Sequence, residues 1–334
     1  MENSVGIIAN PASGKDIRRF VAHASTFDNQ EKINILVRVF SGLEAFGVKK
    51  VYALADPFGL VILAYEKSKS RIPLVLSDFP LENSSQDSTR AASWMVQQSV
   101  GCIITLGGDG TNRVVAKASV NTPLLPLSTG TNNVFPSMTE GTLAGIAAAA
   151  VCAGIDNVET AIVQKRCLHI YKNENKVDLA LIDAVIYADL FRGSGAIWDP
   201  GKILGLILAE RHPAVIGAAA IANSLDIPSE KTQAGIWVEV GGEAPIVMVP
   251  FAPGLILPIP IKAVHWLSVG DRVPLHEQGA TLALDGERDL YIREQDHFEV
   301  CVSDQGPRVV MVDQVLEIAR QNRFFHKIKE VVLH

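Results

Sequence analysis

The sequence predicts a doubly wound α/β domain with a mostly parallel sheet, followed by a β-rich domain that is mainly antiparallel. Two observations lead to this prediction. Up to about residue 156, short apolar runs alternate with helical patterns, and beyond about residue 157 strand-like runs follow one another with few helices between them. We therefore divide the chain into residues 1–156, residues 157–312, and a C-terminal helix and tail at 313–334 that returns toward the first domain.

Short apolar runs within residues 1–156 predict the strands of the first sheet. Each run ends in a turn-rich segment, and runs of this length are typical of parallel strands that are covered on both faces. Between them, apolar residues recur three and four positions apart, as from Ile33 to Phe46, where Gly47 would end the helix. Helices are also predicted at 113–118 and 142–155. The predicted strands are 5–9, 51–54, 72–76, 102–106 and 123–127.

The second part of the chain predicts a succession of strands with one helical interlude. The interlude, at about 203–223, is rich in Ala and Gly. Gly241-Gly242 and Asp285-Gly286 predict hairpin turns, because both dipeptides suit the positive φ angles of tight turns. Near the end of the chain, Asp313 would cap the last helix. The predicted strands are 177–186, 235–240, 245–249, 281–284 and 298–302.

Charge and composition exclude several classes of function. The 334 residues carry 30 Lys and Arg against 36 Asp and Glu, a formal net charge of −6, which lacks the basic surface of a nucleic-acid-binding protein. No continuous apolar stretch reaches the ~20 residues of a membrane span, and the first residues lack the basic and apolar regions of a secretory signal. The four Cys form no C-x-x-C pair, and the eight His form no H-x-x-x-H pair. We therefore expect a cytoplasmic protein without a nucleic-acid partner, a membrane partner or a dedicated metal site.

Three polar, Gly-containing segments follow predicted strands of the first sheet. Because the carboxyl ends of parallel strands meet at one edge of a sheet, where open α/β sheets bind their ligands, we expect these segments to lie together. The first segment is rich in small residues and ends in the cation Lys15, and the third supplies hydroxyl and amide groups suited to ribose or phosphate. The segments are Asn10-Pro11-Ala12-Ser13-Gly14-Lys15, Gly107-Gly108-Asp109-Gly110-Thr111-Asn112 and Ser128-Thr129-Gly130-Thr131-Asn132-Asn133.

The second of these segments has the most specific chemistry. Its three glycines would let successive N–H groups face an anion at the start of a helix. Asp109 would be repelled by a polyphosphate unless it meets a bridging cation or accepts a proton from a nucleophile, and both situations suit phosphoryl transfer. Neither a Walker A loop nor the G-x-G-x-x-G fingerprint is present. Each segment alone is also compatible with a turn that only closes the βα geometry, whereas the three together predict a nucleotide or phosphate site.

This set of motifs resembles the ATP-NAD kinase and diacylglycerol kinase superfamily, and within it the acetoin catabolism protein X branch of the NAD kinase-like proteins. The most specific match is Gly107-Gly108-Asp109-Gly110-Thr111, supported by Asn10-Pro11-x-Ser13-Gly14 and Thr129-Gly130-Thr131-Asn132-Asn133. The resemblance covers nearly the whole chain, because Leu284-Asp285-Gly286-Glu287 and Phe324-Phe325 fall where the family has its second-domain D-G-[EQ] motif and its C-terminal return. It implies an NAD kinase-like fold with an active site in the cleft between the two domains.

The same resemblance implies a homo-oligomeric kinase that transfers a phosphoryl group from ATP to a small-molecule acceptor, with Mg²⁺ held mainly through the nucleotide phosphates. Asp109 would be the base that activates the acceptor hydroxyl, and Glu287 matches a catalytic residue of the lipid-kinase relatives. The implied nucleotide-binding residues are Asn10, Ser13, Gly14, Lys15, Gly107, Gly108, Gly110, Thr111, Asn112, Thr129, Gly130, Thr131, Asn132 and Asp183.

Two departures from the family pattern leave the acceptor open. Asp183 is retained from an amide-acid pair, but Ile182 stands where the amide would bind the adenylate side of NAD and cannot make its hydrogen bonds. The family's Pro-Thr-Gly-Ser-Thr-Ala-Tyr stretch does not occur in the sequence. The hypotheses are an NAD kinase that forms NADP, a lipid or small-alcohol kinase, and a non-catalytic nucleotide-binding accessory protein linked to acetoin catabolism. Asp285-Gly286-Glu287 is either a hairpin turn or part of the catalytic site.

Overall fold

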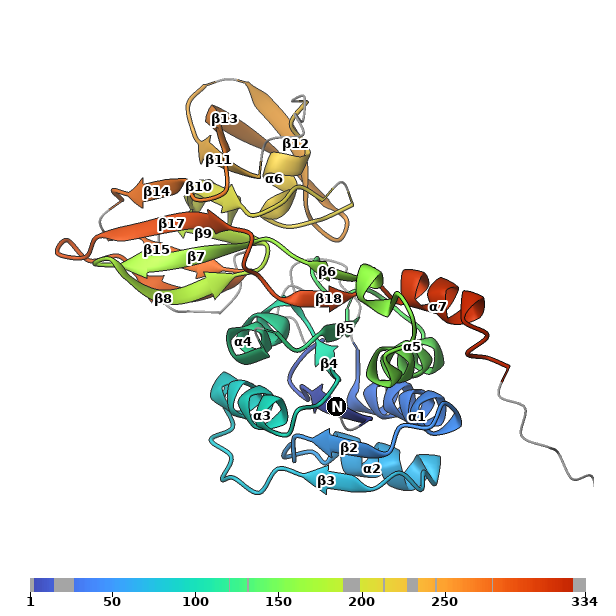
Figure 1. Ribbon diagram of the computed structural model, residues 1–334. Helices are drawn as coiled ribbons and strands as arrows, with labels where there is room; N and C mark the ends of the chain where they lie inside the picture. The colour runs from blue at the N-terminus through green and yellow to red at the C-terminus, as the bar shows by residue number, and fades with distance from the viewer. Residues whose placement is uncertain are drawn as a thin grey trace, which may run out of the picture.

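A seven-stranded sheet forms the first domain and confirms the predicted α/β architecture (Figure 1). The computed structural model describes residues 3–14, 27–119, 121–130, 132–188, 199–212, 214–226, 234–243, 245–277 and 279–326. All pairings in this sheet are parallel except the one between β18 and β6. In spatial order the strands are β3 (Leu74–Leu76), β2 (Lys50–Ala53), β1 (Ser4–Ala9), β4 (Cys102–Gly107), β5 (Leu124–Ser128), β18 (Arg308–Val310) and β6 (Ile162–Gln164).

Helices cover both faces of this sheet, which explains why its strands are apolar without alternation (Figure 1). Val5 and Ile7 of β1 pack with the helices of one face, and the next residue, Ile8, packs with those of the other. All six residues of β1 are buried. The first face carries α1 (Asn29–Ala45), α2 (Leu60–Ser68), α5 (Gly141–Ala153) and α7 (Val312–Gln321), and the second carries α3 (Ser85–Gln97) and α4 (Asp109–Ser119).

The second domain is a sandwich of two antiparallel sheets (Figure 1). Apolar residues from both sheets, such as Ile170 and Val300 from one and Ile186 and Leu282 from the other, form the core between them. One sheet is ordered β12 (Ile246–Ala252), β13 (Leu255–Leu267), β11 (Gly235–Val240), β10 (Ile203–Leu208), β9 (Asp183–Tyr187), β15 (Thr281–Leu284) and β16 (Glu287–Tyr291). The other is ordered β14 (Arg272–Leu275), β17 (Phe298–Ser303), β7 (Cys167–Lys172) and β8 (Asn175–Ala180).

The strand predicted at 177–186 is wrong as a single element. The structure divides it into β8 and β9, which lie in different sheets of the sandwich. The chain turns at Leu181 and Ile182, whose N–H groups donate to the Asp285 carboxylate at 2.9 and 2.7 Å. These backbone groups are therefore satisfied by a distant side chain rather than by a neighbouring strand.

Two further predictions for the second domain are wrong. The predicted helical interlude at 203–223 contains β10, which pairs on both sides with β9 and β11, and only the short helix α6 (Ala219–Asn223). Gly205 suits this strand because a Cβ there would lie 2.3 Å from the Trp237 ring on β11. Gly241-Gly242 does not join a hairpin, since β13 lies between β11 and β12. The other predicted turn is confirmed: Asp285 and Gly286 join β15 to β16 with φ angles of 51° and 80°.

The chain crosses between the domains near residues 165 and 307. Strands β6 and β18, which the sequence places within 157–312, pair with each other, and β18 also pairs with β5, so both belong to the first sheet. Helix α7 then packs against α5 through Val315 and Ala319. Its N-cap is Met311 rather than the predicted Asp313, which lies in the first helical turn. Within the described residues no helix has both the length and the apolar character needed to cross a membrane.

Helices α1 and α5 approach each other closely because glycines line their contact. A Cβ at Gly145 would lie 2.4 Å from the Val39 carbonyl oxygen, and a Cβ at Gly42 would lie 2.5 Å from the Thr142 carbonyl oxygen. Distances this short require the backbone of one helix to move.

We expect Gly145→Ala to lower the free energy of unfolding by roughly 1–3 kcal/mol, because the displaced helix contact outweighs the better helix propensity of Ala. Urea denaturation measures the change. Leu143→Ala, at a partly exposed position of the same helix, is the control and should have a smaller effect. Equal or higher stability of Gly145→Ala would show that the two helices separate freely.

Candidate active site between the two domains

The three polar segments lie together, as predicted, because they follow neighbouring strands. They succeed β1, β4 and β5, which are adjacent in the sheet. Strand β1 pairs with β2 on one side and β4 on the other, so the strand order reverses beside these loops. Such a switch point is where open α/β sheets bind ligands.

Direct contacts hold the three loops against one another. The Asn10 amide donates to the Thr111 hydroxyl at 2.8 Å, which joins the first loop to the second. A Cβ at Gly14 would lie 2.6 Å from the Thr129 carbonyl oxygen, so only glycine lets the first loop approach the third this closely. Gly14 also has a φ of 71°, which favours glycine.

Lys32, on α1, fixes the conformation of the first loop by binding its backbone carbonyl groups. Its ammonium group is fully buried, and a buried charge is tolerated only when polar groups surround it. Because the loop carbonyls turn toward Lys32, the loop is held in one conformation. The ammonium donates to the carbonyl oxygens of Asn10 (3.0 Å), Pro11 (3.1 Å) and Ser13 (2.6 Å) and to the Asn29 side chain (3.2 Å).

Asp109 is the first residue of α4, which therefore begins four residues before the predicted start at 113. Its half-buried carboxylate accepts hydrogen bonds from the backbone N–H groups of Val134 (3.0 Å) and Phe135 (2.8 Å). This arrangement joins the second loop to the third and fixes the orientation of the carboxylate.

Other predicted residues support the loops from inside. Asn112 is fully buried, accepts from the Thr105 hydroxyl at 2.6 Å and donates to the Gly108 carbonyl at 2.9 Å. A Cβ at Gly107 would lie 2.6 Å from the Thr111 side chain. These contacts explain local structure, and the nucleotide contacts of these residues stay a prediction.

A small cavity of about 50 Å³ lies where the loops meet the second domain. Asp109 and Asn132 line it from the first domain, and Asp183, Asp285 and residues 216–219 line it from the second. Three aspartates from separate elements therefore face one space. Within the described part of the chain no group of three His, Cys, Asp or Glu side chains is arranged to hold a metal ion.

Asp285 is a carboxylate that the sequence marked only as part of the Asp285-Gly286-Glu287 motif, with no role of its own. Its side chain is fully buried and accepts from the N–H groups of Leu181, Ile182 and Asp183. Burial raises its pKa to about 7, against the opposing effects of the Arg113 guanidinium and the backbone hydrogen bonds. The nearby charge of Asp109 raises that pKa further. The D-G dipeptide was the available signal, but its role as a hairpin turn concealed the buried side chain.

Arg113 connects the two domains beneath the cavity. It lies one helical turn after Asp109 on α4, and its buried guanidinium contacts Asp178 at 3.2 Å and Asp285 at 3.9 Å. Lys117 contacts Asp178 as well, at 2.7 Å. Removing one partner of a buried charge network is costly, so this contact holds α4 and the second domain in register.

Three predicted site residues cannot be placed in the same way. Lys15 and Thr131 lie outside the described residues. Glu287 lies at the start of β16, directly after the Asp285-Gly286 turn, but the description does not extend to its side chain. Asp183 begins β9 and lines the cavity from the second domain. The other predicted residues, Ser13, Thr129 and Gly130 among them, lie in the three converging segments.

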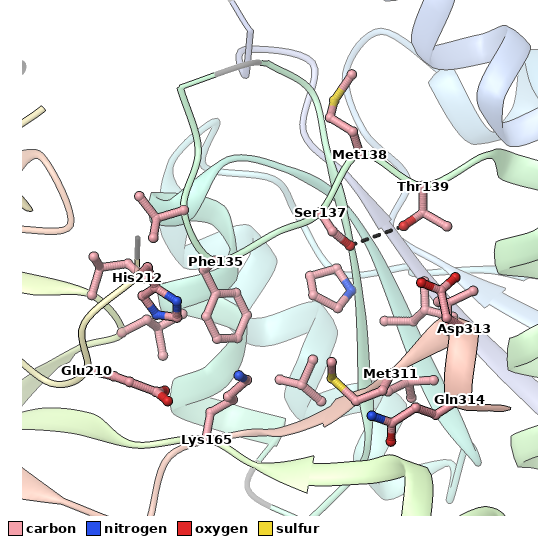
Figure 2. Close-up of a pocket in the computed structure, with 18 of the residues that line it drawn as sticks. Phe135, Ser137, Met138, Thr139, Lys165, Glu210, His212, Met311, Asp313 and Gln314 are labelled. Atoms are coloured by element: carbon pink, nitrogen blue, oxygen red, sulfur yellow. Dashed lines mark hydrogen bonds between the residues drawn. The ribbon is translucent and has the colours of Figure 1, made fainter. Parts of the chain in front are cut away.

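A larger cavity, of about 610 Å³, shares part of its lining with the aspartate cavity. Figure 2 shows the residues around the larger cavity. Val134 and Ile182 line both cavities and therefore lie between them. The larger cavity extends between the 134–140 segment, the start of α7 and the connections at residues 165–166 and 210–212. Its volume lies within the range of small-molecule sites.

Comparison with known proteins agrees with this architecture. Residues 5–154 match the ATP-NAD kinase N-terminal domain, and residues 166–305 match the acetoin catabolism protein X C-terminal domain. These ranges follow the two domains of the structure. The fold and the cleft thus define an NAD kinase-like protein.

A curated relative shows which branch this is. The chain is 32% identical over 340 residues to acetoin catabolism protein X of Cupriavidus necator, covering 98% of this chain and 95% of the relative. The chain therefore belongs to the acetoin catabolism protein X family, as the sequence motifs predicted.

Solved structures with a similar fold are more distant. A yeast NADH kinase complexed with NADH has a TM-score of 0.48 and 13% identity, covering 99% of this chain and 90% of that one. A putative diacylglycerol kinase from Bacillus anthracis str. Sterne has a TM-score of 0.42 and 12% identity, covering 92% of this chain and 97% of that one.

The raised pKa of Asp285 predicts a specific dependence of stability on pH. The folded chain keeps this proton up to about pH 7, whereas the unfolded chain releases it near 3.8. Between these values, rising pH favours the unfolded state, so the Asp285 contribution to stability falls. We expect the free energy of unfolding of Asp285→Asn, minus that of the wild type, to increase by a few kcal/mol from pH 4 to 7 and then level off.

Urea denaturation at several pH values measures this difference. The exposed Asp304→Asn serves as the control and should show no comparable trend across this range. A difference between Asp285→Asn and wild type that is constant with pH would contradict a protonated Asp285.

Proposed function

We propose that the chain is an ATP-dependent phosphotransferase that acts at the cleft between its domains. The observation that carries the proposal is the placement of Asp109. It begins a helix at the meeting point of three polar loops and faces a cavity completed by the second domain. A chain whose first domain matches the ATP-NAD kinase N-terminal domain gives this geometry a specific chemical interpretation.

The proposed reaction is proton removal coupled to phosphoryl transfer. An acceptor hydroxyl donates its proton to the Asp109 carboxylate as its oxygen bonds to the terminal phosphorus of ATP, and the bond to ADP breaks. The Val134 and Phe135 N–H groups keep the carboxylate oriented toward the acceptor. In a loose transition state, correct position contributes more than basicity.

The loops suit the phosphates of Mg-ATP, which supplies the transferable phosphoryl group. The Gly-rich loop before α4 and the first turn of that helix present backbone N–H groups, which favour anions. Carboxylates such as Asp109 and Asp183 would repel nearby phosphates unless a cation lies between them, so a cation held mainly through the nucleotide is consistent with the site.

The acceptor is NAD in the first form of this proposal, which would make the product NADP. A lipid or small-alcohol kinase is the second candidate, and a specific observation favours it. Ile182 lines both cavities, so an aliphatic side chain stands at the junction where an acceptor would pass. Glu287 is the further catalytic candidate in that case.

We expect Asp109→Asn to reduce phosphoryl transfer by about 10²–10⁴-fold, the typical contribution of a general base, with ATP affinity nearly unchanged. Purified protein is incubated with Mg-ATP and NAD, and NADP is quantified by enzymatic cycling. Glycerol and diacylglycerol with labelled ATP test the second candidate. The exposed Asp78→Asn is the matched control and should retain full activity.

Equal turnover in wild type and Asp109→Asn would remove Asp109 from the mechanism. ATP binding without transfer to any of these acceptors would instead favour the nucleotide-binding accessory protein. A selective loss in Glu287→Gln during transfer to a lipid would identify the lipid-kinase form.

A further inference from the structure

The 610 Å³ cavity has a distinct end that the proposed reaction does not use (Figure 2). Lys165, Glu210 and His212 gather there around the ring of Phe135. They come from two separate connections, one before β7 and one after β10. The topology therefore brings a cation, an anion and an imidazole to one wall.

These three side chains are half-buried, and none makes a hydrogen bond or an ion pair with another described residue. They are nevertheless close, since burial lowers the pKa of His212, Glu210 raises it and Lys165 lowers it. Opposite charges that line one cavity without pairing leave their hydrogen-bonding capacity for another molecule. Partly desolvated charges of this kind are costly unless water or a ligand satisfies them.

The rest of the cavity wall is mainly apolar. Phe135, Met138 and Met311 contribute a ring and two flexible thioethers, and Ile182 closes the side toward Asp109. Such a wall suits the apolar part of a small ligand, and a few polar groups then fix the orientation of that ligand. The remaining charged lining groups have other roles or lie elsewhere: Arg166 donates to the Ala234 carbonyl, Glu140 caps α5, and Asp313 lies at the opposite end.

We propose that this cavity binds the non-reacting part of the phosphoryl acceptor, and that the acceptor is an amphipathic organic anion. Its apolar body contacts Phe135 and Met311, and its carboxylate or phosphate pairs with Lys165. The assignment as acceptor rests on the proposed function, because the hydroxyl must pass Val134 and Ile182 to reach Asp109. The binding of an organic anion in this cavity does not depend on the proposed phosphoryl transfer.

Glu210 sets the selectivity of the same end. It accepts a hydrogen bond from a hydroxyl or amine beside the anionic group, and it repels a second negative charge. For a singly charged anion without such a donor, Lys165 therefore raises the binding affinity and Glu210 lowers it.

The test uses 8-anilinonaphthalene-1-sulfonate, an aromatic anion whose fluorescence increases in apolar surroundings, with the intact chain and no ATP. We expect saturable binding of one dye per chain. Lys165→Met should weaken it at least tenfold, and Glu210→Gln should tighten it at least twofold. Lys67→Met, an exposed lysine on α2, is the control and should leave the affinity unchanged.

A second control locates the dye. Ile246, Met248 and Ile256 are about 60% exposed on the β12–β13 hairpin and form an alternative apolar surface. Loss of binding in Ile256→Ser, or unchanged affinity in Lys165→Met, would overturn the cavity assignment, as would the absence of saturable binding. A change in the same direction for Lys165→Met and Glu210→Gln would overturn their opposed roles.

Displacement of the dye identifies the anionic group. We expect benzoate or phenyl phosphate to displace it and neutral benzyl alcohol not to. Equal displacement by benzyl alcohol would overturn the requirement for an anion. Because none of these measurements needs turnover, their failure is distinguishable from a failure of Asp109→Asn to affect phosphoryl transfer.

Discussion

The structure depends on one buried carboxylate at the boundary between its domains. Asp285 accepts the N–H groups of residues 181–183 and thereby turns the chain from β8 into β9, which lie in opposite sheets of the sandwich. The same carboxylate meets Arg113, which lies one helical turn from Asp109. A single side chain thus shapes the second domain, attaches it to α4 and sets the wall opposite the candidate base.

The sequence was informative about the fold where structure is decided locally. The buried runs that became β1, β4 and β5 have both faces covered, so their apolar character alone marks them as strands. The sequence was misleading where contacts between residues far apart in the chain determine the structure. The Ala- and Gly-rich 203–223 segment has no strong preference, and pairing with β9 and β11 makes part of it a central strand. The turn between β8 and β9 requires the Asp285 carboxylate, which lies 104 residues after Leu181 in the sequence.

The same distinction applies to the site. Glycines and hydroxyls directly after strands are visible in the sequence, and the topology of a parallel sheet brings them together without further information. Lys32 was not predicted, because a lysine within a helical pattern resembles an exposed residue until the loop folds over it. Arg113 and Asp285 acquire their roles only when the domains meet. Local patterns therefore indicate candidate ligand-binding groups, while the groups that position them depend on tertiary structure.

Electrostatics link these observations to the proposed chemistry. Three aspartates around one small cavity would repel a polyphosphate if all were charged. Burial keeps the proton on Asp285 up to about pH 7, and the Arg113 guanidinium lies 3.9 Å from the same carboxyl group. A carboxyl group that already holds its proton cannot accept another from an acceptor hydroxyl, which disfavours Asp285 as the proposed base below about pH 7. This makes Asp109, oriented by two backbone N–H groups, better suited to act as the base than the more deeply buried Asp285.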